Sequence, residues 1–437
     1  MKNSIENKSC NEVTNFELDI DVNVDTLTEL IHLQEQYGNY FKVRSGKGRF
    51  AYFVNEPELT NSLLVKNHGN FNKGPGFERI KMLLGNGLIV SDGDIWRRAR
   101  RMIQPTFSRQ NIHKLISKMV ICASDRAELW EKLVLKDEAI NITQQTSDFA
   151  LELILKSIFG HNYTNLFDES GDNPFSFLSE DSTRDLTVVI KMRNLRKLIL
   201  HIINTRKEST ELDDEYDFMH MYLNATDKDG LKFTDTELID EIITLIVAGY
   251  ETSAGTLNWV WLLLSQNIEV AEQLYIESDY LHSNIENIDI EMINNMKFTQ
   301  SILEETLRLY PPVWLFSRRA VIDTKIGESL IPDKSDIYIS PYIMHRTTEY
   351  WSQPDLFQPR RFITKRKNKK NNSAFIPFSL GPRRCLGEYF SFLEMKIHIG
   401  IMIKKFQIEV SPRYNPQLNL GINLRSKNDI FLKLRKR

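Results

Sequence analysis

One segment constrains the fold more than any other, because it predicts a helix that is too long and too apolar for the surface. Thr234 and Glu237 match the capping box T-x-x-E, in which the two side chains cap each other's backbone N–H groups at a helix N-terminus. Apolar residues then recur at helical spacing, namely Ile239, Ile242, Ile243, Ile246, Val247, Ala254, Leu257, Trp261 and Leu264. The pattern predicts an interior helix of about 30 residues, far above the usual length.

The rest of the chain predicts a mainly α protein with a smaller β portion contributed by both ends. Residues 40–54 resemble a β-hairpin, residues 56–310 have helical spacing, and residues 311–375 contain short strand-like runs. A further helix is expected at 387–405. Strands from both ends can share a sheet only if the chain folds back as one unit. We therefore expect a single domain over residues 1–437, with residues 1–35 partly disordered.

Charge and cysteine content exclude several classes of protein. The formal net charge is −2, so no excess of basic residues exists to neutralise nucleic-acid phosphates. The three cysteines, Cys10, Cys122 and Cys385, contain no C-x-x-C pair and cannot form a complete disulfide framework. We find no signal-peptide core and no run of about 18 apolar residues, so we expect a soluble, cytoplasmic protein without a transmembrane segment.

The segment PFSLGPRRCLG at residues 377–387, here called the cysteine loop, carries the most informative cysteine. Gly381 and Gly387 bracket Cys385, and glycine lets a tight loop approach a flat ligand closely. Arg383 and the start of the next helix both favour the thiolate form of Cys385. An isolated cysteine is more often an inert core residue. A thiolate in this setting, however, is what haem iron takes from cysteine.

The spacing F-x-x-G-x-R-x-C-x-G, formed by Phe378, Gly381, Arg383, Cys385 and Gly387, resembles the haem-binding signature of the cytochrome P450 family. The resemblance covers residues 40–437 and implies that Cys385 binds the iron of haem b. It also implies the family's fold, a triangular helical prism with the long central helix over the haem.

Two further motifs resemble those of the family and imply a structural network behind the cysteine loop. Glu305 and Arg308 lie three residues apart on a helix, as in the family's E-x-x-R, and PRRF at residues 359–362 resembles its P-x-R-F. In the family, the Glu, its Arg and the later Arg, here Arg361, form a buried network. Arg360 stands where a Glu is common, at a position that we expect to face outward. An E-x-x-R alone is usually a surface ion pair.

The long central helix contains AGYET at residues 248–252, which resembles the family's oxygen-activation motif A-G-x-[D/E]-T. The Thr252 hydroxyl can bond back to the Ala248 carbonyl, and with Gly249 this would open a small groove in the helix beside the haem. The resemblance implies catalytic roles in proton relay for Glu251 and Thr252. Without Cys385, a helix kink with one surface acid would be the preferred interpretation.

The carboxylates of a haem need cationic partners. Trp96 and Arg100 in WRRARR resemble the family's W-x-x-x-R, whose members contact a propionate. Arg318 and Arg383 are the other expected propionate partners, with His68 as a further candidate.

The implied reaction is a monooxygenation that inserts one oxygen atom from O2 into a lipophilic small molecule. We expect no fused reductase, so electrons would come from a separate ferredoxin or flavodoxin with its NAD(P)H reductase. Arg97, Arg98, Arg384 and the basic loop Lys365–Lys370 are expected to make the face on the Cys385 side positive, to suit an acidic electron carrier. Without that role, Arg97, Arg98 and Arg101 form a solvated basic helix face.

The expected substrate pocket is apolar, although each of its candidate residues could equally be ordinary core. The candidates are Phe77, Ile89, Val247, Val313, Trp314 and Phe316. They leave open fatty acids, terpenoids, steroids and macrolide-like compounds.

Three other functions are disfavoured. A haem-thiolate isomerase or dehydratase, or a peroxide-driven enzyme, commonly lacks the acid–Thr pair that Glu251 and Thr252 form here. A haem-binding sensor would usually need an output module, and residues 1–40 are too few and too polar to be one.

Overall fold

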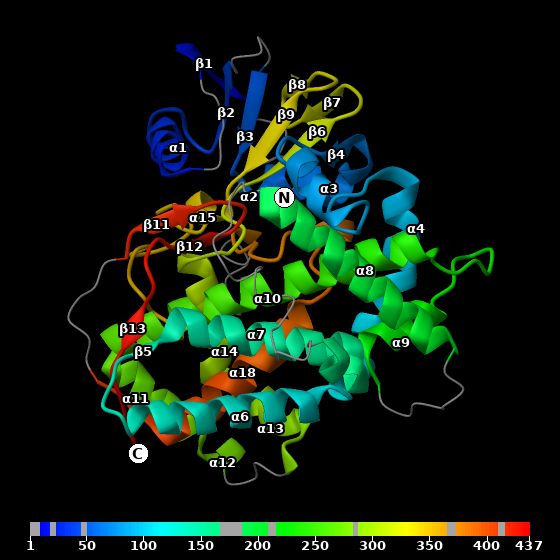
Figure 1. The fold of residues 1–437 in the computed structure, drawn as a ribbon. Coiled ribbons are helices and arrows are strands. Elements are labelled where there is room, and N and C mark those ends of the chain that lie inside the picture. Colours follow the sequence, from blue (N-terminus) through cyan, green and yellow to red (C-terminus); the bar gives the residue numbers. More distant parts are fainter. Residues whose placement is uncertain are drawn as a thin grey trace.

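The computed structural model of the protein describes residues 9–17, 23–44, 50–166, 186–208, 216–282, 287–364, 373–409 and 416–437. Figure 1 shows a β-sheet at one end of the molecule and helices through most of the rest. The predicted class, mainly α with a smaller β portion, is confirmed.

The main sheet joins strands from distant parts of the chain, in the order β1-β2-β3-β9-β6-β4. These strands are β1 (Asn11–Glu17), β2 (Tyr40–Arg44), β3 (Phe50–Val54), β4 (Phe71–Lys73), β6 (Phe316–Ala320) and β9 (Asp336–Ile339). β2 and β3 form the predicted hairpin, with Tyr40 opposite Val54. β3 then pairs in parallel with β9, so the chain does fold back to complete the sheet.

The remaining strands form two-stranded pairs. They are β5 (Ile140–Asn141) with β13 (Phe431–Leu432), β7 (Thr324–Ile326) with β8 (Ser329–Ile331), β10 (Phe406–Ile408) with β14 (Leu434–Lys436), and β11 (Leu418–Leu420) with β12 (Leu424–Ser426). β5 lies within the helical region and pairs with β13 near the C-terminus, so this region is also tied to the end of the chain.

Helices form the body of the molecule. They are α1 (Val24–Tyr37), α2 (Pro57–Asn61), α3 (Phe77–Leu84), α4 (Gly93–Ile103), α5 (Arg109–His113), α6 (Ile116–Val134), α7 (Ile142–Phe159), α8 (Leu186–Glu208), α9 (Phe218–Asn224), α10 (Asp235–Gln266), α11 (Ile268–Glu277), α12 (Asp279–His282), α13 (Ile290–Asn295), α14 (Lys297–Leu309), α15 (Pro341–Met344), α16 (Arg360–Thr364) and α18 (Glu388–Lys405). Short π or 3-10 segments are η1 (Ser62–Lys66), η2 (His68–Asn70), η3 (Gln104–Phe107), η4 (Gly160–Leu166) and η8 (Gly381–Arg383).

The N-terminal segment that was predicted to be partly disordered contains regular structure where it is described, and the prediction itself stays untested. β1 pairs with β2, and α1 begins after Asn23, whose side chain caps the first turn of the helix at 2.8 Å. Leu27, Leu30 and Leu33 bury one face of α1 in the core. The stripe is narrow and most of the surrounding residues are polar, which is why composition did not reveal it.

The central helix α10 runs through the interior for 32 residues, as predicted. Its capping box is formed, with the Thr234 hydroxyl accepting from Glu237 N and the Glu237 carboxylate accepting from Thr234 N at 2.8 Å. Figure 1 shows α7 running beside it. Gly249 permits this approach, because a Cβ there would lie 2.8 Å from Ile154 Cδ1 on α7.

The helix that follows the cysteine loop, α18, also packs against α10. Glu394 on α18 is 1% exposed, and its carboxyl group contacts the hydroxyl of Ser253 on α10. Burial raises the pKa of Glu394 to about 8, so its carboxyl group is mostly protonated at pH 7. A protonated carboxyl needs no counter-ion, and this makes its burial tolerable.

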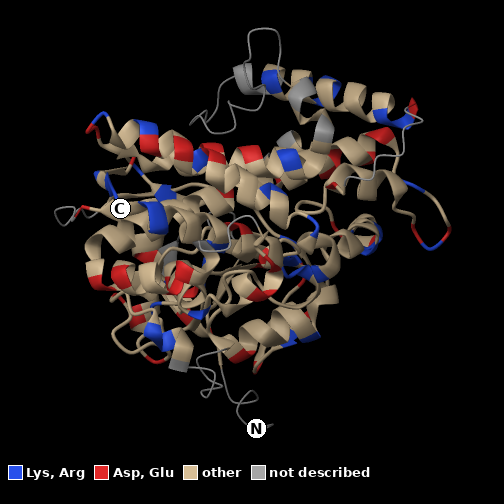
Figure 2. Ribbon diagram, turned by 90° about the horizontal axis from the view of Figure 1, so that it is seen from below, with Lys and Arg blue, Asp and Glu red and all other residues tan. Residues whose placement is uncertain are grey.

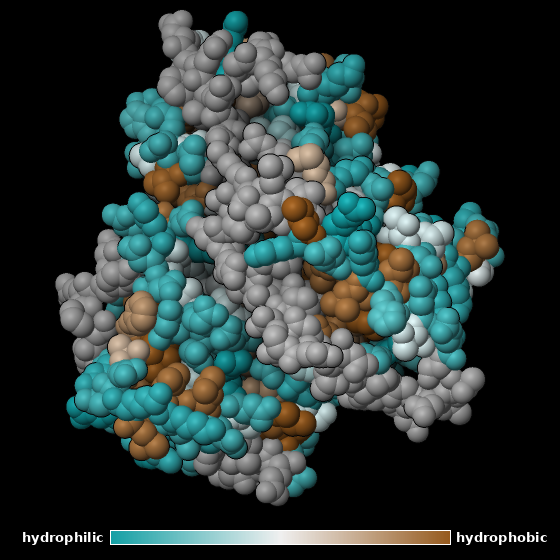
Figure 3. All heavy atoms as spheres, viewed as in Figure 1, coloured by the Kyte–Doolittle hydropathy of each residue, from teal (hydrophilic) through white to brown (hydrophobic). Residues whose placement is uncertain are grey.

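The surface mixes polar and apolar groups without a dominant charge. Figure 2 shows residues of both signs interspersed along the outer helices, as the net charge of −2 suggests. In Figure 3, apolar residues lie in small separate groups on a mostly hydrophilic face. Within the described ranges, no helix has the length and apolar character needed to cross a bilayer.

Replacing Glu394 by Gln is expected to reduce the loss of stability at high pH. The folded-state pKa is raised from 4.5 to about 8, so the free energy of unfolding falls as pH rises through this window. Urea unfolding of the haem-loaded protein at pH 5 and pH 8 measures that fall. Glu394→Gln should lose less stability than wild type, and Glu128→Gln, at an exposed position, should behave as wild type. Equal losses in all three proteins would contradict the interpretation.

Candidate functional site

The cysteine loop is held in a tight conformation beside η1. Cys385 N donates a hydrogen bond to Phe378 O at 3.0 Å, which closes the loop. Gly381 has φ +70°, and a Cβ there would collide with the carbonyl oxygen of Leu64. Gly387 has an ordinary φ of −79°, and an added Cβ would lie 3.9 Å from Cys385 Sγ. The conformational need for glycine is thus strict at Gly381 and absent at Gly387.

Opposing effects act on the Cys385 thiol. Burial raises its pKa, although part of the side chain remains accessible at the open side of the loop. Hydrogen bonds from the backbone N–H groups of Gly387 and Glu388, and the charge of Arg100, lower it. The predicted help from the helix N-terminus is therefore present, while the positive charge comes from Arg100 and not, as predicted, from Arg383, which is paired with Asp92; burial outweighs both effects. A metal ion bound to the sulfur would supply the missing positive charge.

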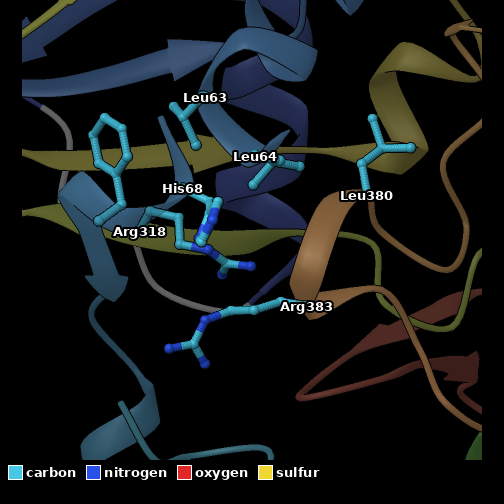
Figure 4. Close-up of a pocket in the computed structure, with 7 residues that line it drawn as sticks. Leu63, Leu64, His68, Arg318, Leu380 and Arg383 are labelled. Atoms are coloured by element: carbon cyan, nitrogen blue, oxygen red, sulfur yellow. The ribbon is translucent and has the colours of Figure 1, made fainter. Parts of the chain in front are cut away.

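A pocket beside the cysteine loop gathers several expected haem contacts. Its lining residues are Leu63, Leu64, His68, Phe71, Arg318, Leu380 and Arg383. Figure 4 shows the side chains of His68, Arg318 and Arg383 projecting toward one another from three separate segments. The structure thus brings together three residues that the sequence suggested as propionate partners. Their contact with a propionate stays a prediction.

The cations around this pocket are poorly balanced by carboxylates. Arg318 is 5% exposed and, among the described residues, forms no ion pair. Burial and repulsion from Arg383 lower the pKa of Arg318 to about 10. Burial and repulsion from the same two arginines also lower the pKa of Lys73, a residue that no motif singled out. Asp92 pairs with Arg383 and is the acid common to all three cations, so a further anion fits here.

The two residues of the W-x-x-x-R motif both contact the cysteine loop. The Arg383 guanidinium lies 4.2 Å from the ring centroid of Trp96, which is buried. Arg100 Nη1 donates to the carbonyl oxygen of Arg384 at 2.9 Å. α4 is therefore fastened to the cysteine loop by both residues.

The predicted network of Glu305, Arg308 and Arg361 is present and buried. Arg308 donates twice to the Glu305 carboxylate, at 2.8 and 2.9 Å, and Arg361 Nε donates to it at 2.9 Å. The side chains of Glu305 and Arg308 are both 0% exposed. Arg360, as expected, faces outward and donates to Gln273 at 3.0 Å.

His345, which sequence reasoning missed, links this network to the chain that leads into the cysteine loop. Its carbonyl oxygen accepts from Arg308 Nη1 at 2.9 Å, and its Nε2 accepts from Ile376 N at 3.0 Å. Burial and the charges of Arg308 and Arg346 lower the pKa of His345 to about 3. The imidazole is therefore neutral at ordinary pH and can act as the acceptor that this bond requires.

The AGYET segment has the predicted back-bond, and the groove expected beside the haem stays a prediction. Thr252 Oγ1 donates to Ala248 O at 2.9 Å. α10 is nevertheless continuous through residues 248–252, and Gly249 packs closely against α7. The missing side chain of Gly249 makes room for Ile154. Thr252 O also accepts from Thr256 Oγ1 at 2.8 Å.

Glu251 is ion-paired rather than free. Its carboxylate contacts the guanidinium of Arg425 on β12, and its side chain is 15% exposed. The partner lies 174 residues away in a short strand, and no sequence motif pointed to it. The structure thus adds Arg425 to the candidate site.

Two expected substrate-pocket residues are buried in core clusters. Trp314 is 0% exposed and its Nε1 donates to Gly421 O at 3.1 Å. Phe316 on β6 belongs to a buried apolar cluster, and the Arg318 guanidinium lies 5.1 Å from its ring centroid. The contact of either aromatic residue with a substrate stays a prediction. Val313 is 36% exposed.

Three other candidates, Phe77, Ile89 and Val247, are partly buried and remain compatible with a pocket. Phe77 begins α3, Ile89 lies in the loop between α3 and α4, and Val247 is on α10. Gly87, two residues before Ile89, packs so tightly on Thr244 of α10 that a Cβ there would collide with its hydroxyl. The loop that carries Ile89 therefore touches α10 one helical turn before Ala248.

The predicted basic face is only partly present. Arg98 forms ion pairs with Asp227 and Glu237 that fasten α4 to the start of α10 and offset its charge. Arg97 and Arg384 are exposed; Arg97 pairs with Asp94 on the same helix, and Arg384 pairs with Glu388 at the start of α18. The basic loop Lys365–Lys370 lies outside the described residues.

The chain is similar to known proteins over most of its length. The family model "Cytochrome P450" matches residues 20–432. Cyclooctatin synthase from Streptomyces melanosporofaciens is 28% identical, over 88% of this chain and 87% of the relative. Pentalenene oxygenase from Streptomyces avermitilis is 27% identical, over 86% and 85%. Carotene epsilon-monooxygenase, chloroplastic, from Arabidopsis thaliana is 26% identical, over 92% and 80%.

The fold agrees as well. The crystal structure of the cytochrome P450DA heme domain superposes with a TM-score of 0.82, at 22% identity, over 94% of this chain and 93% of that one. A family match across nearly the whole chain and a cysteine loop of the family's spacing lead to one identification. The protein belongs to the cytochrome P450 family of haem-iron monooxygenases.

Proposed function

We propose that the protein is a haem-thiolate monooxygenase that inserts one oxygen atom from O2 into a lipophilic small molecule, with haem b as its cofactor. The observation that carries the proposal is the unbalanced positive charge beside the cysteine loop. Lys73, Arg318 and Arg383 share Asp92, which leaves the pocket suited to an anionic group. The two propionates of haem b are anions of the required kind.

The residues present fit this cofactor. Cys385 would hold the iron, and Arg318, Arg383 and His68 would hold the propionates, with Trp96 keeping Arg383 in place. When bound, haem b supplies the iron at which O2 is reduced and cleaved. Arg100 donates a hydrogen bond to the loop on which Cys385 lies and thereby helps to hold the sulfur in position.

Protons would be supplied by Thr252 and Glu251 on α10. The Thr252 hydroxyl can donate and accept at once, so it can pass on one proton while receiving another. Glu251 is the adjacent acid, and Arg425 holds its carboxylate. A proton can reach Thr252 from Glu251 when this ion pair opens, which makes Arg425 a positioning residue for the relay.

We further propose an apolar substrate. Two relatives are named for the hydrocarbons pentalenene and carotene, which supports a substrate of the same lipophilic character. Phe77, Ile89 and Val247 are the remaining candidates for contact with it.

Electrons are proposed to come from a separate acidic carrier, a ferredoxin or flavodoxin with its NAD(P)H reductase, in the cytoplasm. Exposed arginines on α4 and the cysteine loop support this. Arg97 and Arg384 are the exposed candidates for contact with the carrier.

The ligand assignment is tested by the spectrum of the reduced protein under carbon monoxide. Wild type should show the strongly red-shifted Soret band of a thiolate opposite carbon monoxide, and Cys385→His should lose it. Cys122→Ser, which changes a buried thiol in α6, should keep the band. A wild-type protein that binds haem without this band would overturn the proposal.

Replacing Thr252 by Ala should uncouple electron use from product formation. Loss of the hydroxyl removes the proton carrier, so the hydrogen peroxide formed per NADPH consumed should rise at least severalfold. Positioned proton transfer contributes about 10²-fold or more to a reaction rate, so its loss is large enough to produce this rise. Thr252→Ser keeps a hydroxyl and should stay close to wild type. Peroxide and oxygenated product are measured together on one substrate. Full coupling in Thr252→Ala would contradict the relay.

Reversing charge on the proposed docking face should slow electron transfer. Arg97→Glu with Arg384→Glu is expected to lower the rate of haem reduction by a ferredoxin, most strongly at low ionic strength, because steering is screened by salt. Lys325→Glu on β7, in the distant sheet, is the matched control. Stopped-flow reduction at two salt concentrations gives the comparison, and equal rates in both variants would refute this docking face.

A further inference from the structure

Two adjacent acids on α10 fasten the loop between α3 and α4, residues 85–92, here called the α3–α4 loop. Asp240 and Glu241 are each 4% exposed. Asn86 N donates to Asp240 Oδ2 at 2.7 Å, and Leu88 N donates to Glu241 Oε2 at 3.0 Å. Two consecutive buried carboxyl groups thus bind alternate backbone N–H groups of one loop.

The loop is shaped to receive these acids. Gly85 has φ +67°, and a Cβ there would collide with the Asp240 carboxylate. A Cβ on Gly87 would collide with the Thr244 hydroxyl one helical turn later. The backbone of the loop at these glycines therefore lies directly on the side chains of Asp240 and Thr244, with no side chain of its own in between.

Asp240 also binds a third element. Arg196 on α8 forms an ion pair with Asp240 Oδ1, while Oδ2 takes the bond from Asn86. One carboxylate therefore fastens both α8 and the α3–α4 loop to the central helix. Burial, with the nearby charges of Asp240 and Glu237, raises the pKa of Glu241 to about 8. Glu241 is thus mostly neutral at pH 7, and the two neighbouring acids do not repel each other.

The position of these contacts connects them with the reaction. Residues 240, 244 and 248 follow one face of α10, so Asp240 lies about 12 Å along the helix from Ala248. The other end of the loop reaches the cation cluster, where Arg383 Nη1 donates to Ser91 O at 3.0 Å. Ile89 and Val90 lie between the attachments at Leu88 and Ser91.

We propose that Asp240 and Glu241, with Arg196, are positioning residues for the substrate. They hold the α3–α4 loop and α8 against α10, and so set where Ile89 lies beside the AGYET segment. Breaking the Arg196–Asp240 pair loosens the loop and α8 together, so one carboxylate couples two elements that pack on α10. The substrate role rests on the proposed function, whereas the mechanical coupling rests on the contacts alone.

The test uses the haem-loaded protein with Asp240→Asn and Arg196→Gln, and measures two quantities. Hydrogen exchange of residues 85–92 should rise in both variants without any ligand, because the shared carboxylate no longer orders the loop. Binding of 4-phenylimidazole, an apolar probe followed by the haem spectrum, should weaken by about tenfold in each. The double variant should be no weaker than the single ones, because both changes remove the same interaction.

Arg193→Gln, one turn earlier on α8 at an exposed position, is the matched control and should leave both quantities unchanged. If Asp240→Asn loses the haem spectrum, Arg196→Gln carries the test, because its side chain is 32% exposed and its loss is easier to tolerate. Unchanged exchange and affinity in Arg196→Gln would overturn the proposal. Failure of the proposed function would appear separately, in the reduced carbon monoxide spectrum of wild type.

Discussion

The buried carboxylate of Glu305 organises the part of the chain that supports the cysteine loop. It accepts hydrogen bonds from Arg308, from Arg361 and from Gln358 N. The other N–H groups of Arg308 donate to carbonyl oxygens between residues 345 and 356. Burial of an ion pair is favourable only when all of its polar atoms are bonded, and here each partner is. His345 connects this network to Ile376, at the edge of the cysteine loop, because its Nε2 accepts a hydrogen bond from Ile376 N. The position of Cys385 therefore depends on a charge pair that contacts no ligand.

The second constraint is the close approach of other elements to the backbone at glycine. Gly249 allows α7 to lie on α10, Gly85 and Gly87 allow the α3–α4 loop to lie on α10, and Gly381 allows the cysteine loop to lie on η1. In each case a single Cβ would push apart two elements that pack on each other. The shape of the pocket is thus set by missing side chains as much as by the residues that line it.

Local and ordered patterns made part of this structure predictable. The capping box and apolar spacing of α10, the cysteine loop and the pair Glu305–Arg308 all involve residues close in sequence, so their geometry follows from helix periodicity. The pair of Glu251 with Arg425 could not be foreseen, because a strand near the C-terminus supplies the partner. The surroundings of Trp314 could not be foreseen for the same reason. Its indole N–H finds its acceptor at Gly421, over a hundred residues later, and that bond turns the ring into the core.

Buried charges are balanced differently in the core and at the proposed haem pocket. Glu305 is matched by two arginines, Asp240 by Arg196 and Glu251 by Arg425. Glu241 and Glu394 avoid the need for a partner by holding a proton at neutral pH. At the pocket of Arg318, by contrast, three cations share Asp92, and a further arginine would only add to the positive charge. An anion from outside the chain would balance this charge, and this supports the proposal that the haem carboxylates bind at that pocket.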